Sequence, residues 1–287
     1  MSISLRNYRG LEDIDLQNAF WTQATRDLPW CWKPTISPAL YVQRAQFDPR
    51  SRCFAFEGER LVGYMSFTGE GEFVSLGYPW VLPGYEGALQ EKLYETVYGF
   101  AASAEYGGKR FAQRFREQWT DQISFFKRHG FGAESIGSVH ALDLSTVADP
   151  QIRVTGEVEC HVKSCWDDFR DLSRGVVPAE KLAMWQQYFD TVDFDFAVTA
   201  KHAGNTVGTI GVAIRPDTRF AEMIAVAIAP KAADALIFCL SAAVRHARSR
   251  RAKFLGTKPI PIDGSLDVLT HMGFKRVSEE FLFSKSI

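Results

Sequence analysis

The sequence predicts a mixed α/β fold in which one domain is repeated in tandem. Predicted helices and strands alternate along all 287 residues, which favours a mixed sheet covered by helices. Three landmarks also recur at nearly constant offsets of 145, 147 and 143 residues, and such self-similarity indicates an internal repeat. The three pairs are Gly63 and Gly208, Pro83 and Pro230, and Gly130 and Gly273.

The first half opens with a strand at 3–8 (ISLRNY) and a helical segment at 11–24. Residues 53–67 predict a β-hairpin, because two apolar runs flank a polar turn at 57–60. A strand ending in PWVLP (79–83) leads to a long helix at about 88–105. A strand at 109–117 then precedes a short helix, which ends in FFKRHGF (125–131), and a last strand.

The second half repeats this order. A hairpin at 195–212 is followed by a strand ending in AIAP (227–230), a helix at 233–251 and a strand at 252–257. A short helix then ends in HMGF (271–274) before a last strand. Apolar periodicity lapses at 144–154, and Asp149-Pro150 disfavours helix there. We therefore predict one domain at 1–146 and a second at 151–287.

Charge and composition exclude several classes of function. Thirty-three Lys and Arg against 34 Asp and Glu give a net charge of −1, which offers no general attraction to nucleic acid or an anionic membrane. Five widely spread cysteines fit reduced thiols. The N-terminus has no signal-peptide core, and the most apolar stretch, 223–244, is interrupted by Pro230, Lys231 and Asp234. We expect a cytoplasmic protein, and the oligomeric state is left open.

This order of elements, with the FFKRHGF ending, resembles the GNAT (GCN5-related N-acetyltransferase) superfamily of acyl-CoA-dependent N-acyltransferases. In that family a short helix ends in aromatic-Tyr-x-x-x-Gly-Phe, and a Pro-x-x-Arg-Gly-x-Gly-x-Gly loop precedes the long helix. The resemblance covers both halves. It implies two tandem GNAT-like domains of the α/β (α+β) class, each a mixed, mostly antiparallel sheet flanked by helices.

The resemblance implies acetyl-CoA as co-substrate, held in the first half. Glycines in the family's loop let backbone N–H groups at a helix N-terminus approach the pyrophosphate, and the splayed strand before it binds the pantetheine arm. VLPGYEGALQEKL (81–93) matches the start of this loop but has Glu86 where Arg or Gln is usual, while APKAADALIF (229–238) has no glycine. The implied cofactor-binding residues are Val81, Leu82, Gly84, Tyr85, Gly87, Ala88 and Phe126.

The catalytic residues follow from the same comparison. The family's Tyr, which protonates the leaving thiolate, aligns with Phe126 and Leu269, and neither side chain can donate a proton. A base must still deprotonate the acceptor ammonium. Glu72 precedes the strand that enters the loop and Glu117 ends the next strand, so both are candidates. The alternative is that they are solvated charges near turns.

Other motifs are weaker. Trp30 and Trp32, in DLPWCWKPTISP (27–38), are candidate platforms for substrate, or fill the space between helix and sheet. CHVKSC (160–165) lacks the Cys-x-x-Cys spacing of a structural zinc site, so no metal is predicted. The basic run at 245–253 closes the long second-half helix, where positive charge complements the dipole.

These observations predict acetyl transfer from acetyl-CoA to a primary amine, on a small molecule or a peptide, in the first half. Direct attack is expected because no activated Cys or Ser constellation is visible. The alternative is a non-catalytic GNAT-like protein that binds a ligand or partner, which the altered loops and missing Tyr favour. No nucleic-acid or membrane partner is expected.

Overall fold

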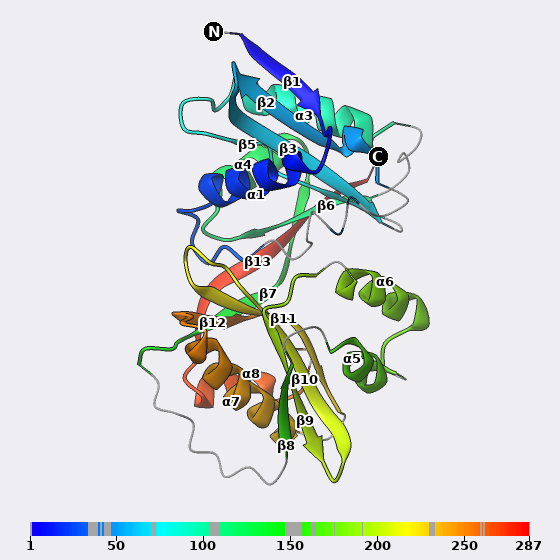
Figure 1. Ribbon diagram of the computed structural model, residues 1–287, viewed down its shortest axis with the longest axis vertical. Helices are drawn as coiled ribbons and strands as arrows, with labels where there is room; N and C mark the ends of the chain where they lie inside the picture. Colours follow the sequence, from blue (N-terminus) through cyan, green and yellow to red (C-terminus); the bar gives the residue numbers. More distant parts are fainter. Residues whose placement is uncertain are drawn as a thin grey trace. The chain divides into compact units, whose positions relative to one another are not determined.

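The computed structural model describes residues 2–33, 40, 42, 47–70, 73–103, 110–146, 157–161, 165–174, 176–190, 192–229, 233–258, 260 and 262–286 (Figure 1). The chain forms two compact units. The first comprises residues 1–29, 38–136 and 279–287, and the second comprises 30–37 and 137–278. Within the described ranges, no helix combines the length and the apolar character needed to cross a membrane.

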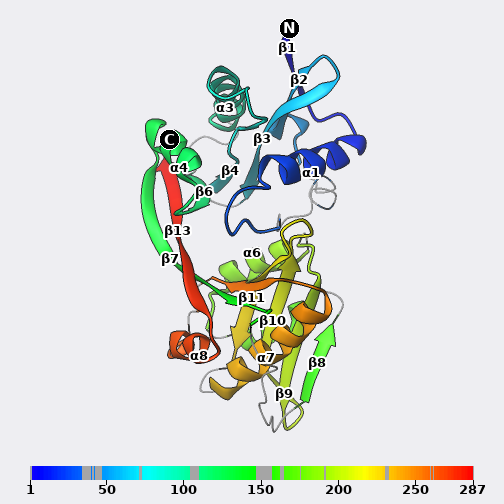
Figure 2. The ribbon, with the colours of Figure 1, turned by 90° about the vertical axis from the view of Figure 1, so that its left-hand side faces the viewer.

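The first unit is built on a sheet with the strand order β1-β2-β3-β4-β6-β13, and β5 also pairs with β3. β4 and β6 are parallel, whereas the other pairs described in this unit are antiparallel. Helices α1 and α3 cover opposite faces of this sheet (Figure 2). The elements are β1 (Ile3–Asn7), α1 (Glu12–Ala24), the 3-10 helix η1 (Pro49–Ser51), β2 (Arg52–Glu57), β3 (Arg60–Glu70), β4 (Phe73–Leu76), β5 (Trp80–Val81), α3 (Ala88–Ala101), β6 (Arg110–Arg116), α4 (Thr120–Arg128) and the end of β13 (Lys275–Ser286).

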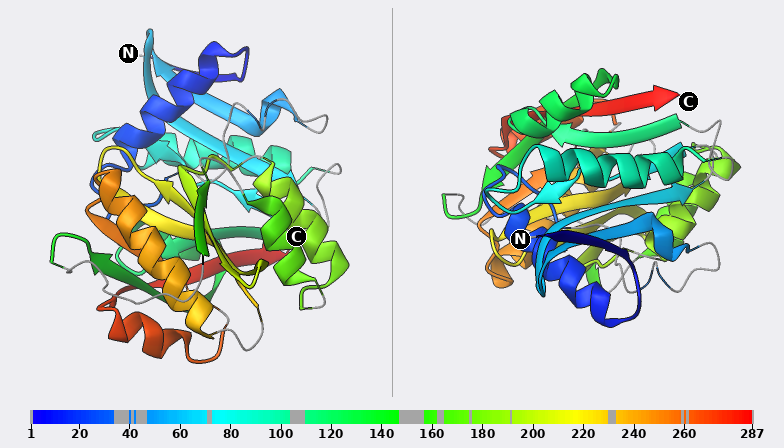
Figure 3. Two further views of the ribbon diagram at one scale, coloured as in Figure 1. Left: turned by 60° about the horizontal axis from the view of Figure 1, so that its bottom comes forward. Right: turned by 90° about the horizontal axis from the view of Figure 1, so that it is seen from above.

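The second unit repeats this plan with the strand order β8-β9-β10-β11-β12-β7. β11 and β12 are its parallel pair, and α7 lies on the opposite face from α5 and α6 (Figure 3). The predicted mixed, mostly antiparallel sheet with flanking helices is thus confirmed in each unit. The elements are β7 (Gly132–Asp143), β8 (Glu157–His161), α5 (Trp166–Ser173), α6 (Ala179–Phe189), β9 (Phe196–His202), β10 (Asn205–Ile214), β11 (Phe220–Ile228), α7 (Ala233–Ser249), β12 (Phe254–Thr257) and α8 (Ser265–His271).

The repeated glycines Gly63 and Gly208 let a helix pack closely on the sheet. A Cβ at Gly63 would lie 2.9 Å from Cδ1 of Leu93 on α3, and one at Gly208 would lie 2.9 Å from Sγ of Cys239 on α7. Real Cβ atoms do not approach other atoms this closely, so a larger residue would push the helix away. The first pair of landmarks therefore has the same physical cause in both halves.

The repeated Gly-Phe endings are helix C-caps. Gly130 and Gly273 have φ values of 78° and 89°, a left-handed conformation that glycine adopts without steric cost. The N–H of the following Phe131 donates to the carbonyl of Phe126, and Phe274 makes the matching bond at the end of α8. Both rings are buried, so each ending stops a helix and turns the chain back to the sheet.

The last strand of each sequence half pairs outside its own half. β13 pairs antiparallel with β6, from Glu280 opposite Arg116 to Ser286 opposite Arg110, and β7 pairs with β12 (Figure 1). Arg116 and Glu280 form a fully buried ion pair, with Nη1 and Oε2 2.5 Å apart. The compact units are therefore composed differently from the sequence halves. The predicted division at 146–151 stays a prediction, because 147–156 lies outside the described residues.

Candidate functional site

The strand that enters the predicted cofactor loop separates from its neighbour β6. Parallel pairing of β4 with β6 ends at Ser75, and Gln113 Nε2 then donates to the Leu76 carbonyl at 2.8 Å. Beyond this point the Gly77 N–H donates to the Ser66 carbonyl on β3, and β5 pairs with β3. A Cβ at Gly77 would lie 2.6 Å from that carbonyl oxygen, so this close approach requires glycine. We call the opening between β5 and β6 the strand separation.

Aromatic side chains fill the strand separation. The Tyr78 ring is 5% exposed and contacts the rings of Trp80, Phe115 and Phe125, with centroids 4.7, 6.4 and 5.4 Å away. Its hydroxyl accepts a hydrogen bond from Gln90 Nε2 at 2.7 Å. Burial raises the pKa of Tyr78 to about 12, so the phenol stays protonated at neutral pH. A pantetheine arm can enter here only if Tyr78 moves.

Helices α3 and α4 are joined beside this cluster. His129, at the C-terminus of α4, places Nε2 2.9 Å from Glu91 Oε2 on α3 and Nδ1 2.8 Å from the Phe125 carbonyl. Its ring stacks on Phe125 and contacts Tyr94, with centroids 4.3 and 4.1 Å away. The hydrogen bond and the ring contacts hold the two helices together on this face of the sheet.

The predicted loop forms an exposed turn at the start of α3. Gly84 and Gly87 have φ values of 92° and 76°, and no atom lies within 4 Å of a Cβ at either. The helix starts at Ala88, and Gln90 Oε1 accepts the Gly87 N–H at 3.2 Å. Backbone N–H groups in such a turn favour an anion. Glu86 supplies one itself, because its Oε2 accepts the Gly84 N–H at 2.8 Å.

The other predicted cofactor residues lie in β5, in the turn itself or in the core under α4. Val81 is half-buried in β5, and the buried Leu82 donates its N–H back to β3. The Tyr85 hydroxyl donates to Glu57 Oε2 at 2.6 Å, which ties the turn to β2. Phe126, in contrast, is fully buried among other phenylalanine rings, so it is a core residue under α4.

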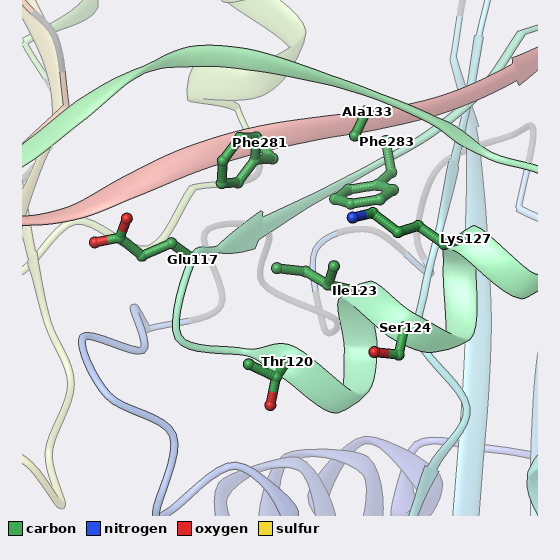
Figure 4. Close-up of a pocket in the computed structure, with 8 residues that line it drawn as sticks. All are labelled: Glu117, Thr120, Ile123, Ser124, Lys127, Ala133, Phe281 and Phe283. Atoms are coloured by element: carbon green, nitrogen blue, oxygen red, sulfur yellow. The ribbon is translucent and has the colours of Figure 1, made fainter.

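A cavity of about 290 Å³ lies between α4 and the end of β13 (Figure 4). Glu117, which follows β6, is at one side, and Lys127 extends from α4 at the other. Ile123, Phe281 and Phe283 lie between them. We call this the α4–β13 cavity; its lining is Glu117, Thr120, Ile123, Ser124, Lys127, Ala133, Phe281 and Phe283.

One of the two predicted catalytic carboxylates can be placed. Glu117 is half-buried in the wall of the α4–β13 cavity, and its Oε1 accepts a hydrogen bond from Gln118 Nε2 at 3.3 Å. Its backbone N–H donates to the Glu279 carbonyl at 2.8 Å, which fixes the end of β6 against β13. Glu72 lies outside the described residues.

The predicted substrate residues Trp30 and Trp32 belong to the second unit. The Trp30 ring makes edge contacts with Phe220 and Phe254, with centroids 5.8 and 5.3 Å away. Lys258 Nζ lies 5.7 Å from the centroid of the Trp32 ring. Both tryptophans thus pack on the first residues of β11 and around β12, while the predicted cofactor residues lie in the first unit.

The second unit has its own strand separation. β11 pairs with β12 only from Phe220 to Met223, whereas its pairing with β10 runs from Ala221 to Ile228. Asp234 is exposed in the first turn of α7, and residues 230–232 before it are not described. On β11 the Glu222 side chain is 1% exposed. This unit offers no glycine turn comparable to that before α3.

Sequence reasoning missed Tyr78, Gln90 and Lys127. Gly77 could have drawn attention to the neighbouring Tyr78, because a glycine inside a strand marks a bulge or a close backbone approach. Gln90 and Lys127 carried no sequence signal, since each stands at an ordinary helix position. Over the described part of the chain, no three His, Cys, Asp or Glu side chains are grouped so that they could hold a metal ion.

Comparison with known proteins identifies the fold. No protein-family model matches the sequence, and the search of curated proteins found no match. Among solved structures, a tandem GNAT protein from the clavulanic acid biosynthesis pathway aligns over 99% of this chain and 98% of its own, with 12% identity and a TM-score of 0.68. A GNAT-family acetyltransferase from Colwellia psychrerythraea (98% and 99%, 11% identity, TM-score 0.59) and a GCN5-related N-acetyltransferase from Sphaerobacter thermophilus (99% and 95%, 14% identity, TM-score 0.57) are also similar. The chain therefore has the fold of the tandem GNAT proteins.

Proposed function

We propose that this protein is an acyl-CoA-dependent N-acyltransferase, which transfers an acetyl group from acetyl-CoA to a primary amine in its first unit. The observation that supports this best is the course of one strand. β5 leaves β6 and runs directly into the exposed Gly84–Gly87 turn at the start of α3. Open backbone groups beside a helix N-terminus suit a linear thioester that carries phosphates.

The residues of the turn fit the phosphate end of acetyl-CoA. Gly84 and Gly87 have no side chains to obstruct close approach, although the Gly87 N–H already donates to Gln90 Oε1 at 3.2 Å. Glu86 must release the Gly84 N–H before a phosphate can take it. The pantetheine end fits only after Tyr78 leaves the strand separation. Binding is therefore expected to involve movement of these two side chains.

Glu117 is the proposed base. The acceptor ammonium first gives one proton to the Glu117 carboxylate. The amine nitrogen then forms a bond to the thioester carbonyl carbon as the C–S bond breaks, and the nitrogen's second proton passes to the thiolate. The buried Phe126 has no proton to give, so the thiolate leaves without an acid at that position.

A second candidate is a non-catalytic protein that binds a ligand or partner with the same fold. The filled strand separation favours it specifically. The Tyr78 hydroxyl is hydrogen-bonded to Gln90 in the first turn of α3, and its ring is packed on three others. If this arrangement persists when the turn binds an anion, the thioester never reaches the cavity.

Calorimetry with acetyl-CoA and with 3′-phospho-ADP, its fragment without the pantetheine arm, separates the two candidates. The acyltransferase requires acetyl-CoA to bind at least tenfold more tightly than the fragment, because the arm then adds its own contacts. Equal affinities for the two compounds would favour the non-catalytic protein. If neither compound binds at millimolar concentration, the turn binds no coenzyme phosphate, which contradicts its role in both candidate functions. Release of free CoA thiol in the presence of primary amines then tests turnover.

Shortening Tyr78 is expected to ease entry of the pantetheine arm. In Tyr78→Ala the ring no longer has to be displaced, so acetyl-CoA should bind about three- to tenfold more tightly than in the parent, if displacement costs about 1 kcal/mol of aromatic contact. Tyr78→Phe keeps the ring and should bind like the parent. Affinity for 3′-phospho-ADP should not change in either variant; weaker acetyl-CoA binding by folded Tyr78→Ala would contradict this role.

A further inference from the structure

We propose that Gln90 is a positioning residue that couples the two ends of the coenzyme site. It holds Tyr78 in the strand separation while the Gly84–Gly87 turn is empty, and it releases Tyr78 when a phosphate occupies the turn. This deepens the proposed function and, as a statement about acetyl-CoA, rests on it. The coupling itself requires neither an acceptor amine nor turnover.

The half-buried Gln90 amide contacts both ends of this site. Its Oε1 accepts the Gly87 N–H at 3.2 Å, at the turn. Its Nε2 donates to the Tyr78 hydroxyl at 2.7 Å, at the strand separation, and lies 3.5 Å from the Pro79 carbonyl oxygen. One side-chain conformation makes all these contacts, so a single amide links the turn to Tyr78.

The orientation of this amide follows from the chemistry of its neighbours. A backbone N–H can only donate, so Gly87 must face Oε1, and Nε2 is then left to face the Tyr78 hydroxyl and the Pro79 carbonyl. Gln90 is the third residue of α3, and a Gln there often caps a helix by accepting the N–H that precedes it. Capping does not require a bond to Tyr78, which is therefore the contact that indicates coupling.

A phosphate at the turn weakens the hold on Tyr78. The Gly87 N–H is exposed, and a charged phosphate oxygen accepts a stronger hydrogen bond than the neutral Gln90 amide does. Once Oε1 loses this donor, the conformation that also bonds Tyr78 loses support, because hydrogen bonds through one amide reinforce each other. The effect is reciprocal, so displacement of Tyr78 by the pantetheine arm favours phosphate at the turn.

The test uses the two halves of acetyl-CoA, 3′-phospho-ADP and S-acetylpantetheine, as separate probes. In calorimetry, S-acetylpantetheine should bind the parent about three- to tenfold more tightly when 3′-phospho-ADP saturates it, the effect of about one net hydrogen bond. Gln90→Met removes both bonds of the amide, whereas Tyr78→Phe removes only the bond to Tyr78 and leaves Gln90 to cap α3. Each variant alone should bind S-acetylpantetheine as tightly as the saturated parent does, with no further gain from 3′-phospho-ADP.

Gln23→Met is the matched control, because it removes the same amide from an exposed position of α1. It should keep the cooperativity of the parent. Independent binding of the two halves by the parent, or no binding of S-acetylpantetheine even to the saturated parent, would overturn the proposal. Cooperativity that persists in Gln90→Met or in Tyr78→Phe would also overturn it and leave Gln90 as a helix cap.

The same probes separate this proposal from the proposed function. Cooperative binding of the halves without acetyl transfer from acetyl-CoA to any primary amine would leave the coupling standing and remove the acyltransferase. Acetyl transfer by a parent that binds the two halves independently would do the reverse.

Discussion

Arg116→Met is expected to lower the free energy of unfolding by about 3–5 kcal/mol, because it removes the buried partner of the Glu280 carboxylate and leaves that carboxylate a longer, 3.6 Å pair with the half-exposed Arg114. The Arg116 and Glu280 side chains are fully buried, and their Nη1 and Oε2 atoms lie 2.5 Å apart between β6 and β13. Glu280→Gln should have an effect in the same direction. Urea unfolding followed by circular dichroism measures the change.

The double variant Arg116→Met, Glu280→Met is the informative comparison. Removing both charges leaves no uncompensated ion in the interior, since Arg114, the other partner of Glu280, is half-exposed, so the double variant should lose much less stability than Arg116→Met alone. Lys201→Met is a surface control: it breaks a partly exposed pair with Glu159 and should change the free energy of unfolding far less than Arg116→Met does. If the double variant loses as much free energy of unfolding as the two single variants lose together, packing rather than charge pairing holds β13 against β6.

Glu117→Gln is expected to lower kcat/KM for the acceptor amine by about 100- to 10,000-fold, the range that a general base contributes. The substitution keeps the shape of the side chain but removes its ability to take a proton. The dissociation constant of acetyl-CoA should stay unchanged, because Glu117 lies in the α4–β13 cavity and not in the Gly84–Gly87 turn. Thiol-release kinetics measure kcat/KM, and calorimetry measures the dissociation constant of acetyl-CoA.

Glu134→Gln is the matched control, since Glu134 is an exposed carboxylate on β7 that does not line the cavity. It should leave kcat/KM within about twofold of the parent, as expected for a surface change away from the site. If Glu117→Gln keeps full activity, the base lies elsewhere, or an ordered water takes the proton.

The sequence predicted the fold because the cues are local. Gly63 and Gly208 permit helix packing, and Gly130 and Gly273 cap helices, so each of these two glycine pairs is needed in both halves for the same steric reason. Alternating helices and strands could be identified from patterning alone. The mixed, mostly antiparallel sheet then followed from the family resemblance.

The pairing of the last strands could not be predicted in this way. β7 and β13 each have 12 residues and follow equivalent Gly-Phe caps, so apolar pattern does not decide which neighbour each one joins. The partner of β6 is instead fixed by a contact between Arg116 and Glu280, 164 positions apart in the chain. Such a contact depends on tertiary structure.

The candidate site was predictable only in part for the same reason. The turn at Gly84 and Gly87 has a recognisable sequence, and the structure places it in the open at the start of α3. Tyr78 entering the strand separation and Trp30 packing in the second unit are long-range contacts. Glu86 stands where the family usually has Arg or Gln, and its hydrogen bond to the Gly84 N–H is a local contact that a bound phosphate would have to replace.

The affinity of Glu86→Arg for CoA tests the central claim, binding at the first-unit turn, most directly. The substitution frees the Gly84 N–H and replaces a repulsive charge with a bidentate phosphate donor, so binding should tighten about three- to tenfold at low salt and less at high salt. Asp234→Arg, the matching change at the exposed start of α7, should have no effect. Calorimetry of both variants and the parent at two salt concentrations gives the comparison. Tighter binding by Asp234→Arg with no change in Glu86→Arg would contradict the account and assign the coenzyme to the second unit.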